Sequence, residues 1–364
     1  MAEDGSNKIV YYAKTSDGWK LAIKRYQPIG RKSKYPVVLC HGFAANSYSV
    51  DFGLEDTDEW HRYSLAAYLS KGKNRKLKFD VWVPELRGRN GSKTFDTDKY
   101  PEKYNWFLDD YVDKDVPAIV SCIKREYRKE KKRASKVLWV GKSMGGMLAY
   151  AYGQTHAGRR NLKGVVTLGS PSKFDYSSPG FKFFSPLLPR NILSGPLNLS
   201  KQLKKVNGTA FYDIIIENFA NKHNLEKRIL DEYLKTGFNN DVSVNVFKQF
   251  AIFLRHGIFC RYPAYPWLFD LSKKIKFLKK RFSPYSYTEN FHNFKTPLYV
   301  IAGGKDKIAQ PDDVIEVINH VGSRWVNGEI IPEYGHLDLN LGKNAKWDVY
   351  PVVQRELIKI SRLS

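Results

Sequence analysis

The sequence contains few cysteines and no long apolar run. Cys40, Cys122 and Cys260 are the only cysteines among 364 residues, widely separated and each set among apolar neighbours. An odd number at this spacing fits neither a disulfide framework nor a metal-ligand cluster, so it predicts reduced, buried thiols and no metal. No uninterrupted apolar stretch reaches the length of about 18 residues that a transmembrane helix needs, which argues against one.

The amino terminus lacks the pattern of a secretory signal. Residues 1–12 read MAEDGSNKIVYY, polar and acidic where such a signal is basic and then apolar. This argues against export by that route. Together with the reduced thiols it predicts a cytoplasmic location, with peripheral contact to a membrane left open.

Acidic residues are scarce relative to basic ones. The chain has 37 Asp and Glu against 60 Lys and Arg, a formal net charge of +23. Such an excess indicates either attraction to nucleic acid, anionic lipid or acidic substrates, or a solvated lysine-rich surface, and we favour the solvated surface. The sequence has no zinc-finger spacing, RNP-like aromatic box or recognisable helix-turn-helix, so nucleic acid is not predicted as a partner.

Apolar and aromatic residues are plentiful, at 42% and 14% of the chain, which is ample for a buried core. An Asp-Gly turn predicts a β-hairpin of residues 10–15 and 20–26. Apolar runs without alternation predict strands that are covered on both faces, as in a parallel sheet. These runs lie at residues 35–40, 79–84, 137–140, 162–171, 296–304 and 328–332.

Helical patterns separate these strands. Residues 61–72 have helical spacing, and another helix is expected after Asp115, taken as its N-cap, with Pro117 in the first turn. Further helices are expected after the strand at 137–140, after Pro311, and at the end of the chain. This order predicts an α/β fold with a mostly parallel central sheet and helices on both faces.

The alternation of strand and helix breaks between residues 172 and 290. An excursion of this length predicts an inserted, mainly helical cap, which divides the chain into core (1–171), cap (172–290) and core (291–364). From 171 to 290 the chain has 19 Lys and Arg against 9 Asp and Glu. Aromatic and basic residues together favour anionic lipid surfaces, but they also suit the packing faces of a lid. They are concentrated in FKFFSPLLPRNIL at 181–193 and WLFDLSKKIKFLKKRF at 267–282.

A serine lies between glycines where the strand at 137–140 gives way to a helix. The run GKSMGG places Ser143 in the spacing G-x-S-x-G. On a nucleophile elbow the serine takes unfavourable backbone angles, and neighbours with a Cβ would collide with the adjoining strand and helix. Gly141, Gly145 and Gly146 supply that room, and the amino end of the helix favours developing negative charge. We therefore interpret Ser143 as a candidate nucleophile, against a simple turn serine.

A serine hydroxyl needs a base, and the base needs a carboxylate that orients it. His336 follows the last expected strand in GHLDLNLG, and Asp306 follows an earlier strand in GGKD. The order Ser143, Asp306, His336 is the chain order expected when the nucleophile lies on a strand-to-helix turn. Two other carboxylates compete with Asp306: Asp338, close to His336 in the chain, and Asp175, which follows the strand at 162–171.

Two backbone amides are candidates for an oxyanion hole. One belongs to Met144, the residue after the serine, and the other to Phe43, in the loop CHGFAAN. His41 and Gly42 would shape that loop so that the Phe43 amide points into the site. We interpret His41 as structural and not as the base.

Together these motifs resemble the α/β-hydrolase superfamily, over about 10–171 and 296–363. Within it the sequence is most similar to the acid lipases, with a second likeness to polyhydroxyalkanoate synthases at 335–351. The resemblance implies Ser143 as nucleophile, Asp306 as acid, His336 as base, and Phe43 and Met144 as oxyanion donors. The motifs that carry it are HGF (41–43), PELRGRNGS (84–92), GKSMGG (141–146), GGKD (303–306) and GHLDLNLGKNA (335–345).

Two departures from these families matter. The synthases carry cysteine where this chain has Ser143, which argues for hydrolysis, and secreted acid lipases carry a signal peptide and disulfide potential that this sequence lacks. The resemblance implies a serine carboxylic-ester hydrolase of the EC 3.1.1 type, lipase- or esterase-like, that needs no cofactor. The aromatic-rich cap favours a small-molecule or lipid ester with an apolar acyl chain.

Other functions are compatible with the same residues. An acyltransferase or thioesterase would use the same covalent intermediate, and a cofactor-free haloperoxidase or a C–C bond hydrolase would use the same triad. A non-catalytic binding protein of this fold is a further alternative, but such proteins usually lose part of the triad, and this chain keeps all three candidates. One fold serves many chemistries, so the substrate rests on the site and the cap.

Overall fold

An eight-stranded sheet runs through the molecule in the order β1-β2-β4-β3-β5-β6-β9-β10. The computed structural model describes residues 9–53, 60–71, 77–132, 134–174, 195–198, 217–237, 240–272 and 274–364. β1 (Ile9–Lys14) and β2 (Lys20–Tyr26) form an antiparallel hairpin, and β2 pairs antiparallel with β4. The remaining neighbours are parallel: β3 (Val37–Cys40), β4 (Val81–Pro84), β5 (Val137–Lys142), β6 (Leu162–Leu168), β9 (Leu298–Gly303) and β10 (Val326–Ile331).

Every strand expected in the sheet is present within a few residues of its predicted range. The side chains of β3, β4, β5 and β9 are buried along their whole length, which explains why these strands are apolar without alternation. A strand covered on both faces has no side chain facing water, so its sequence shows a continuous apolar run. The prediction of a mostly parallel sheet is confirmed.

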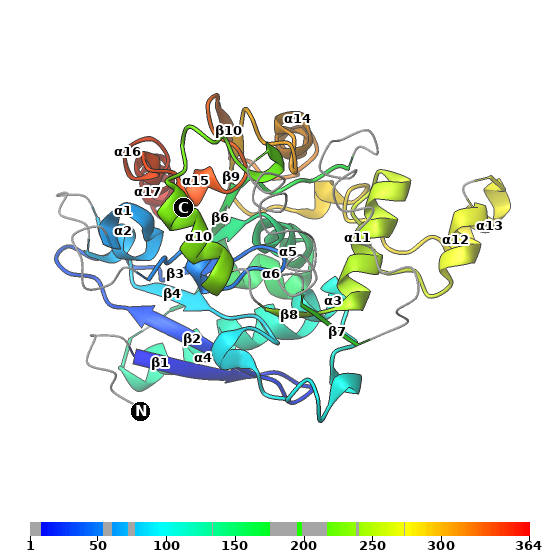
Figure 1. Ribbon diagram of the computed structural model, residues 1–364, viewed down its shortest axis with the longest axis horizontal. Helices are drawn as coiled ribbons and strands as arrows, with labels where there is room; N and C mark the ends of the chain where they lie inside the picture. Colours follow the sequence, from blue (N-terminus) through cyan, green and yellow to red (C-terminus); the bar gives the residue numbers. More distant parts are fainter. Residues whose placement is uncertain are drawn as a thin grey trace.

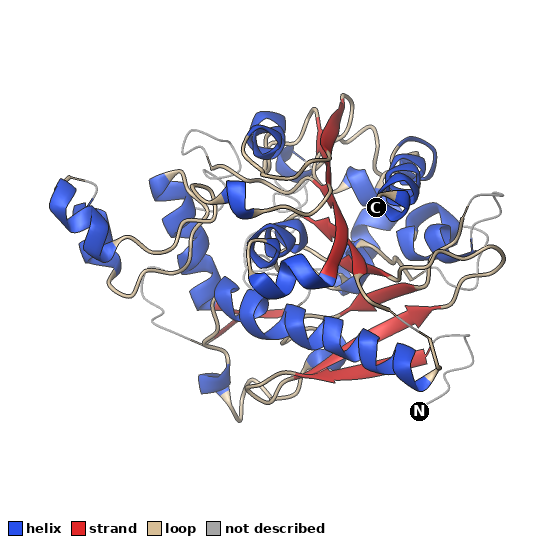
Figure 2. Ribbon diagram, turned by 180° about the vertical axis from the view of Figure 1, so that it is seen from behind, coloured by secondary structure: helices blue, strands red, loops and turns tan. Residues whose placement is uncertain are grey.

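Helices cover both faces of the sheet (Figures 1 and 2). On one face α2 (Leu65–Lys71) and α17 (Tyr350–Arg362) pack into one apolar cluster. On the other, α4 (Val116–Lys129) and α5 (Met144–Gly153) pack into a second. This confirms the α/β class. Shorter core helices are α1 (Trp60–Tyr63), α3 (Leu108–Asp110), α6 (His156–Asn161), α14 (Pro311–Ile315), α15 (Asp338–Leu341) and α16 (Ala345–Asp348).

Asp115 directly precedes α4, as the sequence predicted, but its side chain does not cap the helix. The chain is already helical through the π-turn Tyr111–Asp115, and the Asp115 carboxylate caps no amide of α4. Instead Asp115 Oδ1 accepts hydrogen bonds from Arg87 Nε at 2.8 Å and from Arg87 Nη2 at 2.6 Å. The side chain does not cap the helix because this carboxylate is committed to a buried ion pair.

The cap is mainly helical in its described part, as expected. It contains a small antiparallel pair, β7 (Pro196–Asn198) and β8 (Asp241–Ser243). Its helices are α10 (Lys227–Thr236), α11 (Val244–His256), α12 (Pro266–Ser272) and α13 (Lys276–Phe282). α12 and α13 project from the body, at the right of Figure 1. The run at 181–193 lies outside the described residues, and the division at 171/172 and 290/291 stays a prediction.

The three cysteines are buried and form no disulfide, as the sequence predicted. Among the helices within the described ranges, none is long and apolar enough to cross a membrane.

Replacing Asp115 by alanine is expected to lower the free energy of unfolding by about 3 kcal/mol, because it leaves the buried Arg87 guanidinium with only the half-exposed Asp17 as a partner. Urea unfolding followed by circular dichroism measures this. Asp17→Ala is the matched control, because it removes the more exposed partner, and it should cost clearly less. An equal or larger loss in Asp17→Ala would contradict the assignment of Asp115 as the main partner.

Candidate active site

Ser143 occupies the corner between β5 and α5. Its backbone angles are φ 53° and ψ −122°, a conformation that residues with a side chain rarely adopt. The Ser143 amide donates to the Leu168 carbonyl of neighbouring β6 at 2.9 Å, and the Ser143 carbonyl accepts from the Gly146 amide at 2.9 Å. These bonds hold the strained corner at the carboxyl ends of the parallel strands, where open α/β sheets bind ligands.

Glycines let three backbone segments approach one another at this corner. A Cβ on Gly141 would lie 2.3 Å from the Gly146 nitrogen, and one on Gly145 would lie 2.4 Å from the Cys40 carbonyl oxygen. Both distances are far below any real contact of a Cβ atom. The G-x-S-x-G spacing therefore reflects the close packing of β5, α5 and the end of β3.

His336 and Asp306 meet at the same edge of the sheet, after β10 and β9. His336 Nδ1 lies 2.7 Å from Asp306 Oδ2, and both side chains are buried. The other Asp306 oxygen accepts the backbone N–H groups of Ile308 and Ala309 at 2.9 and 2.8 Å. Asp306 is thus fixed from behind, and its hydrogen bond places the imidazole proton on Nδ1 and leaves Nε2 as an acceptor.

Of the two competing carboxylates, Asp338 is engaged elsewhere. Asp338 accepts from the Gly335 amide at 2.9 Å and from the Asn221 amide at 3.2 Å, and it makes no hydrogen bond to the His336 ring. It therefore orders the backbone around His336 rather than the imidazole itself. Asp175, the other competitor, lies outside the described residues.

The loop that carries His336 is bound to a segment of the cap, residues 217–224. The Leu337 amide donates to the Phe219 carbonyl at 2.6 Å. Asn224 Nδ2 donates to the Glu333 carbonyl at 2.6 Å and to Asp338 Oδ2 at 3.0 Å. The position of His336 therefore depends on the cap as well as on the core.

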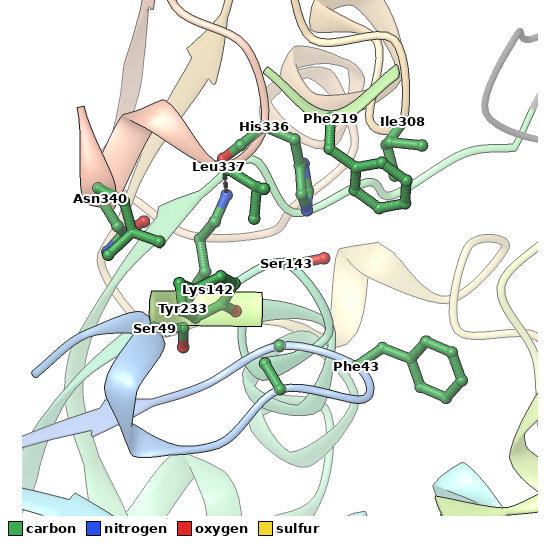
Figure 3. A pocket seen from close by; sticks show the side chains of 13 residues that line it. Phe43, Ser49, Lys142, Ser143, Phe219, Tyr233, Ile308, His336, Leu337 and Asn340 are labelled. Carbon is green, nitrogen blue, oxygen red and sulfur yellow. Dashed lines mark hydrogen bonds between the residues drawn. The ribbon is translucent and has the colours of Figure 1, made fainter. Parts of the chain in front are cut away.

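Ser143 and His336 line one cavity of about 60 Å³. In Figure 3 the His336 ring and the Phe43 ring lie on opposite sides of Ser143. Ser143 and His336 are not hydrogen-bonded to each other in the structure, and catalytic contacts of this kind often tighten only when substrate binds. Most of the other lining side chains are apolar or aromatic: Ala45, Phe219, Tyr233, Ile308, Leu337 and Leu341.

The two candidate oxyanion donors flank the serine. Met144 is the first residue of α5, so its amide has no acceptor within the helix. The Phe43 amide has no acceptor within the described ranges of the chain, and a Cβ on the preceding Gly42 would lie 3.1 Å from the Ser143 Cβ. Neither amide has a described acceptor, so both remain candidates for an oxyanion hole.

His41 is buried and shapes the loop before Phe43. Its Nδ1 lies 2.9 Å from the Gly42 carbonyl, and its Nε2 accepts from the Leu86 amide at 3.2 Å. Burial, assisted by the charge of Arg89, lowers the pKa of His41 to about 3. The ring is thus neutral with both nitrogens occupied, an arrangement that supports a structural role.

Lys142, the variable residue of the G-x-S-x-G spacing, is a functional candidate that sequence reasoning missed. Its side chain is buried, and Nζ donates to the His336 carbonyl at 2.7 Å. A Cβ on Gly169, which has φ +54°, would lie 3.1 Å from both Lys142 Nζ and Asp306 Oδ2 and 3.3 Å from His336 Nδ1. The three groups therefore converge over a residue with no side chain. The available signal was a charged residue ending an apolar strand.

Burial and the nearby carboxylates shift the pKa values of Lys142 and His336 in opposite directions. Burial lowers the pKa of Lys142 to about 8, while Asp306 and Asp338 raise it. Burial also lowers the pKa of His336, the nearby Asp306 raises it, and the Lys142 charge lowers it further. The imidazole is therefore held neutral, the form that accepts a proton. No group of three or more His, Cys, Asp or Glu within the described residues is placed to hold a metal ion.

Comparison with known proteins identifies the fold family and its relatives. The family described as alpha/beta hydrolase fold matches residues 35–342. Among curated proteins, the chain is 26% identical to human lipase member K, over 93% of this chain and 85% of that protein. It is 25% identical to human lysosomal acid lipase/cholesteryl ester hydrolase, with the same shares of each chain covered. The distant homology to acid lipases therefore extends over most of the chain.

Solved structures resemble the fold. An esterase from Exiguobacterium antarcticum superposes with a TM-score of 0.58 at 15% identity, covering 98% of this chain and all of that one. A soluble variant of monoglyceride lipase from Saccharomyces cerevisiae also gives 0.58 at 15% identity, covering 99% of this chain and 97% of that one. At this identity the likeness concerns the fold alone.

Replacing Lys142 by methionine is expected to raise the pKa of His336, because it removes a positive charge that opposes protonation of the imidazole. NMR titration of the imidazole C–H resonances measures this without reference to any activity. Lys305→Met is the control, since Lys305 is half-exposed and pairs with Glu333. An unchanged or lower His336 pKa in Lys142→Met would show that the two groups are not coupled in this way.

Proposed function

Because the chain belongs to the α/β-hydrolase family, we propose that it hydrolyses carboxylic esters with Ser143 as nucleophile, His336 as general base and Asp306 as the orienting acid. The observation that carries the proposal is that Ser143 and His336 line one cavity while Asp306 occupies the far nitrogen of the ring. A serine of this kind is a weak nucleophile until a base takes its proton, and among the described residues His336 is the one histidine that lines that cavity.

The reaction follows from the placement of these groups. Ser143 Oγ attacks the acyl carbon while its proton passes to His336 Nε2, and Asp306 stabilises the imidazolium that forms. The negative charge on the carbonyl oxygen is stabilised by the Phe43 and Met144 amides. The alcohol leaves with the proton from His336, and water, activated by the same imidazole, then cleaves the acyl-enzyme.

The substrate class rests on the cavity wall and on the relatives. The side chains around Ser143 are mainly apolar or aromatic, so an apolar acyl group gains from burial there while a charged one loses hydration. The matched relatives include proteins named as lipases and as esterases. We therefore infer a small-molecule or lipid ester with an apolar acyl chain.

Ser143→Ala is expected to lower kcat/KM for p-nitrophenyl esters by about 10⁴-fold or more, because the nucleophile is removed while the fold is kept. Ser49→Ala is the matched control, since Ser49 also lines the cavity but its hydroxyl donates to the Asn46 carbonyl at 3.0 Å. A Ser143→Ala variant that turns over esters at the rate of the parent protein would exclude this mechanism.

A fluorophosphonate probe distinguishes an enzyme from a binding protein of the same fold. Labelling that is lost in Ser143→Ala and kept in Ser49→Ala supports the enzyme. Folded parent protein that takes up no label contradicts it, because a non-catalytic relative would lack an activated serine.

We also propose that the cap contacts anionic lipid through α12 and α13. Tyr265, Trp267 and Phe277 are among the exposed large apolar side chains there, at 57, 65 and 75% exposure. Lys274 and Lys279 are exposed among them. Aromatic rings that enter the interface and cations that face lipid phosphates together favour an anionic membrane surface. The helices α12 and α13 also project from the body, which leaves them accessible (Figure 1).

Flotation with vesicles that contain phosphatidylserine tests this contact. The parent protein should float with these vesicles and lose most of the association in Trp267→Ala/Phe277→Ala. The control is Tyr12→Ala/Trp347→Ala, which removes two exposed rings that lie outside the cap, at 55 and 58% exposure. Parent protein that stays in the soluble fraction would contradict the proposal, as would equal losses in the two variants.

A further inference from the structure

A second cavity lies at the edge of the sheet opposite to Ser143. It has a volume of about 660 Å³, within the range of small-molecule sites. Lys136 directly precedes β5, Lys163 lies at the start of β6, and Arg324 precedes β10, so the cavity lies where the parallel strands begin. Ser143 follows the other end of β5, so the two cavities are separated by the length of that strand.

The wall of this cavity is strongly basic. Of the thirteen described residues that line it, five are Lys or Arg and none is Asp or Glu. Apolar surface is provided by Leu162, Trp325 and Leu363, which gives room for an organic part beside the charges. The five cationic residues are Lys136, Arg159, Lys163, Lys295 and Arg324.

These cations lack carboxylate partners, unlike the buried cations of the core. Lys136, Arg159 and Lys163 are half-buried, and Lys295 and Arg324 are exposed. Arg25 and Arg87 each bind carboxylates directly. None of the five cavity cations forms an ion pair with a carboxylate of the described chain. Instead Lys136 Nζ donates to the Arg159 carbonyl at 3.3 Å, and Lys163 Nζ donates to the Leu363 carbonyl. Backbone carbonyls orient these ammonium groups but leave their charge uncompensated.

The cations also repel one another. Burial lowers the pKa of the Lys163 ammonium, and the charges of Lys136 and Lys34 lower it further. Lys124, nearby on α4, is affected in the same way by burial, Lys136 and two arginines. An anion between these groups would replace repulsion by attraction.

We propose that this cavity binds an anion that carries two or more phosphate groups, held by Lys136, Lys163 and Arg324. Several phosphates are needed to compensate five cations, and arginine and lysine donors together suit phosphate oxygens. The site is independent of ester hydrolysis, because it lies at the opposite edge of the sheet from Ser143. The same chemistry is offered by a free phosphorylated metabolite and by the headgroup of a phosphorylated inositol lipid.

Isothermal titration calorimetry with inositol hexakisphosphate in 150 mM salt tests the site. Lys136→Gln/Lys163→Gln is expected to weaken binding by about tenfold or more, the loss expected for two charge-assisted hydrogen bonds. The matched control is Lys14→Gln/Lys99→Gln, which removes two exposed lysines outside the cavity and leaves the net charge the same as in the test variant. Equal weakening in both variants, or no binding by the parent protein, would overturn the proposal.

Stability without ligand gives a second readout. Neutralising Lys163 removes repulsion between cations, so the ligand-free Lys136→Gln/Lys163→Gln variant should melt no lower than the parent protein. Hexakisphosphate should raise the melting temperature of the parent protein more than that of the variant. A variant that melts clearly lower without ligand would mean that these lysines serve the fold instead of a ligand, which overturns the proposal.

Two further arms identify the source of the phosphates. Vesicles with phosphatidylinositol bisphosphate are offered to protein that carries Trp267→Ala/Phe277→Ala, so that α12 and α13 do not contribute. Capture that depends on Lys136 and Lys163 supports the lipid headgroup, and hexakisphosphate binding without capture supports a free metabolite. Tighter binding of a short single-stranded RNA than of hexakisphosphate, lost in the same lysine variant, would overturn the proposal in favour of a nucleic-acid surface.

Discussion

The site depends on the close approach of three backbone segments around Ser143. The end of β5, the first turn of α5 and the loop after β3 meet within distances that admit no Cβ at Gly141 or Gly145. At this contact Ser143 has a positive φ, and a Cβ on Gly42, next to Phe43, would lie 3.1 Å from the Ser143 Cβ. The strain at one residue is stabilised by the hydrogen bonds of the strand and helix on each side of it.

Much of this could be predicted from the sequence, because the signals are local. Strands buried on both faces show uninterrupted apolar runs, and a nucleophile elbow needs glycines at fixed spacing, so both can be recognised without coordinates. The pairing of His336 with Asp306 followed from chain order. What could not be predicted depends on which side chains meet across long separations. Asp115 was taken for a cap because nothing in the sequence indicates Arg87 as its partner, and Lys142 looked like a variable position.

The charged side chains at the carboxyl ends of the parallel strands differ in their partners from those at the amino ends. At the carboxyl edge, Lys142 donates to the His336 carbonyl and the His336 ring bonds to Asp306, so each charge has an opposite charge or a dipole close by. At the amino edge, the cations around Lys136 and Lys163 have backbone carbonyls as their only described acceptors. The helices that return to this edge end there, and their partial negative charge offsets part of the excess. The cations that give the chain its net charge of +23 therefore lie in different environments, and only some of them form a solvated surface.

Hydrogen bonds link residues 217–224 of the cap to the loop that carries His336. Since Phe219 and Asn224 hold the backbone next to His336, this segment cannot swing aside without moving the imidazole. It is therefore a wall of the cavity that is tied to the catalytic loop. The same constraint applies over evolutionary time. New specificities are accessible by exchange of the outer cap, whereas the wall beside His336 can change only together with the catalytic loop that it supports.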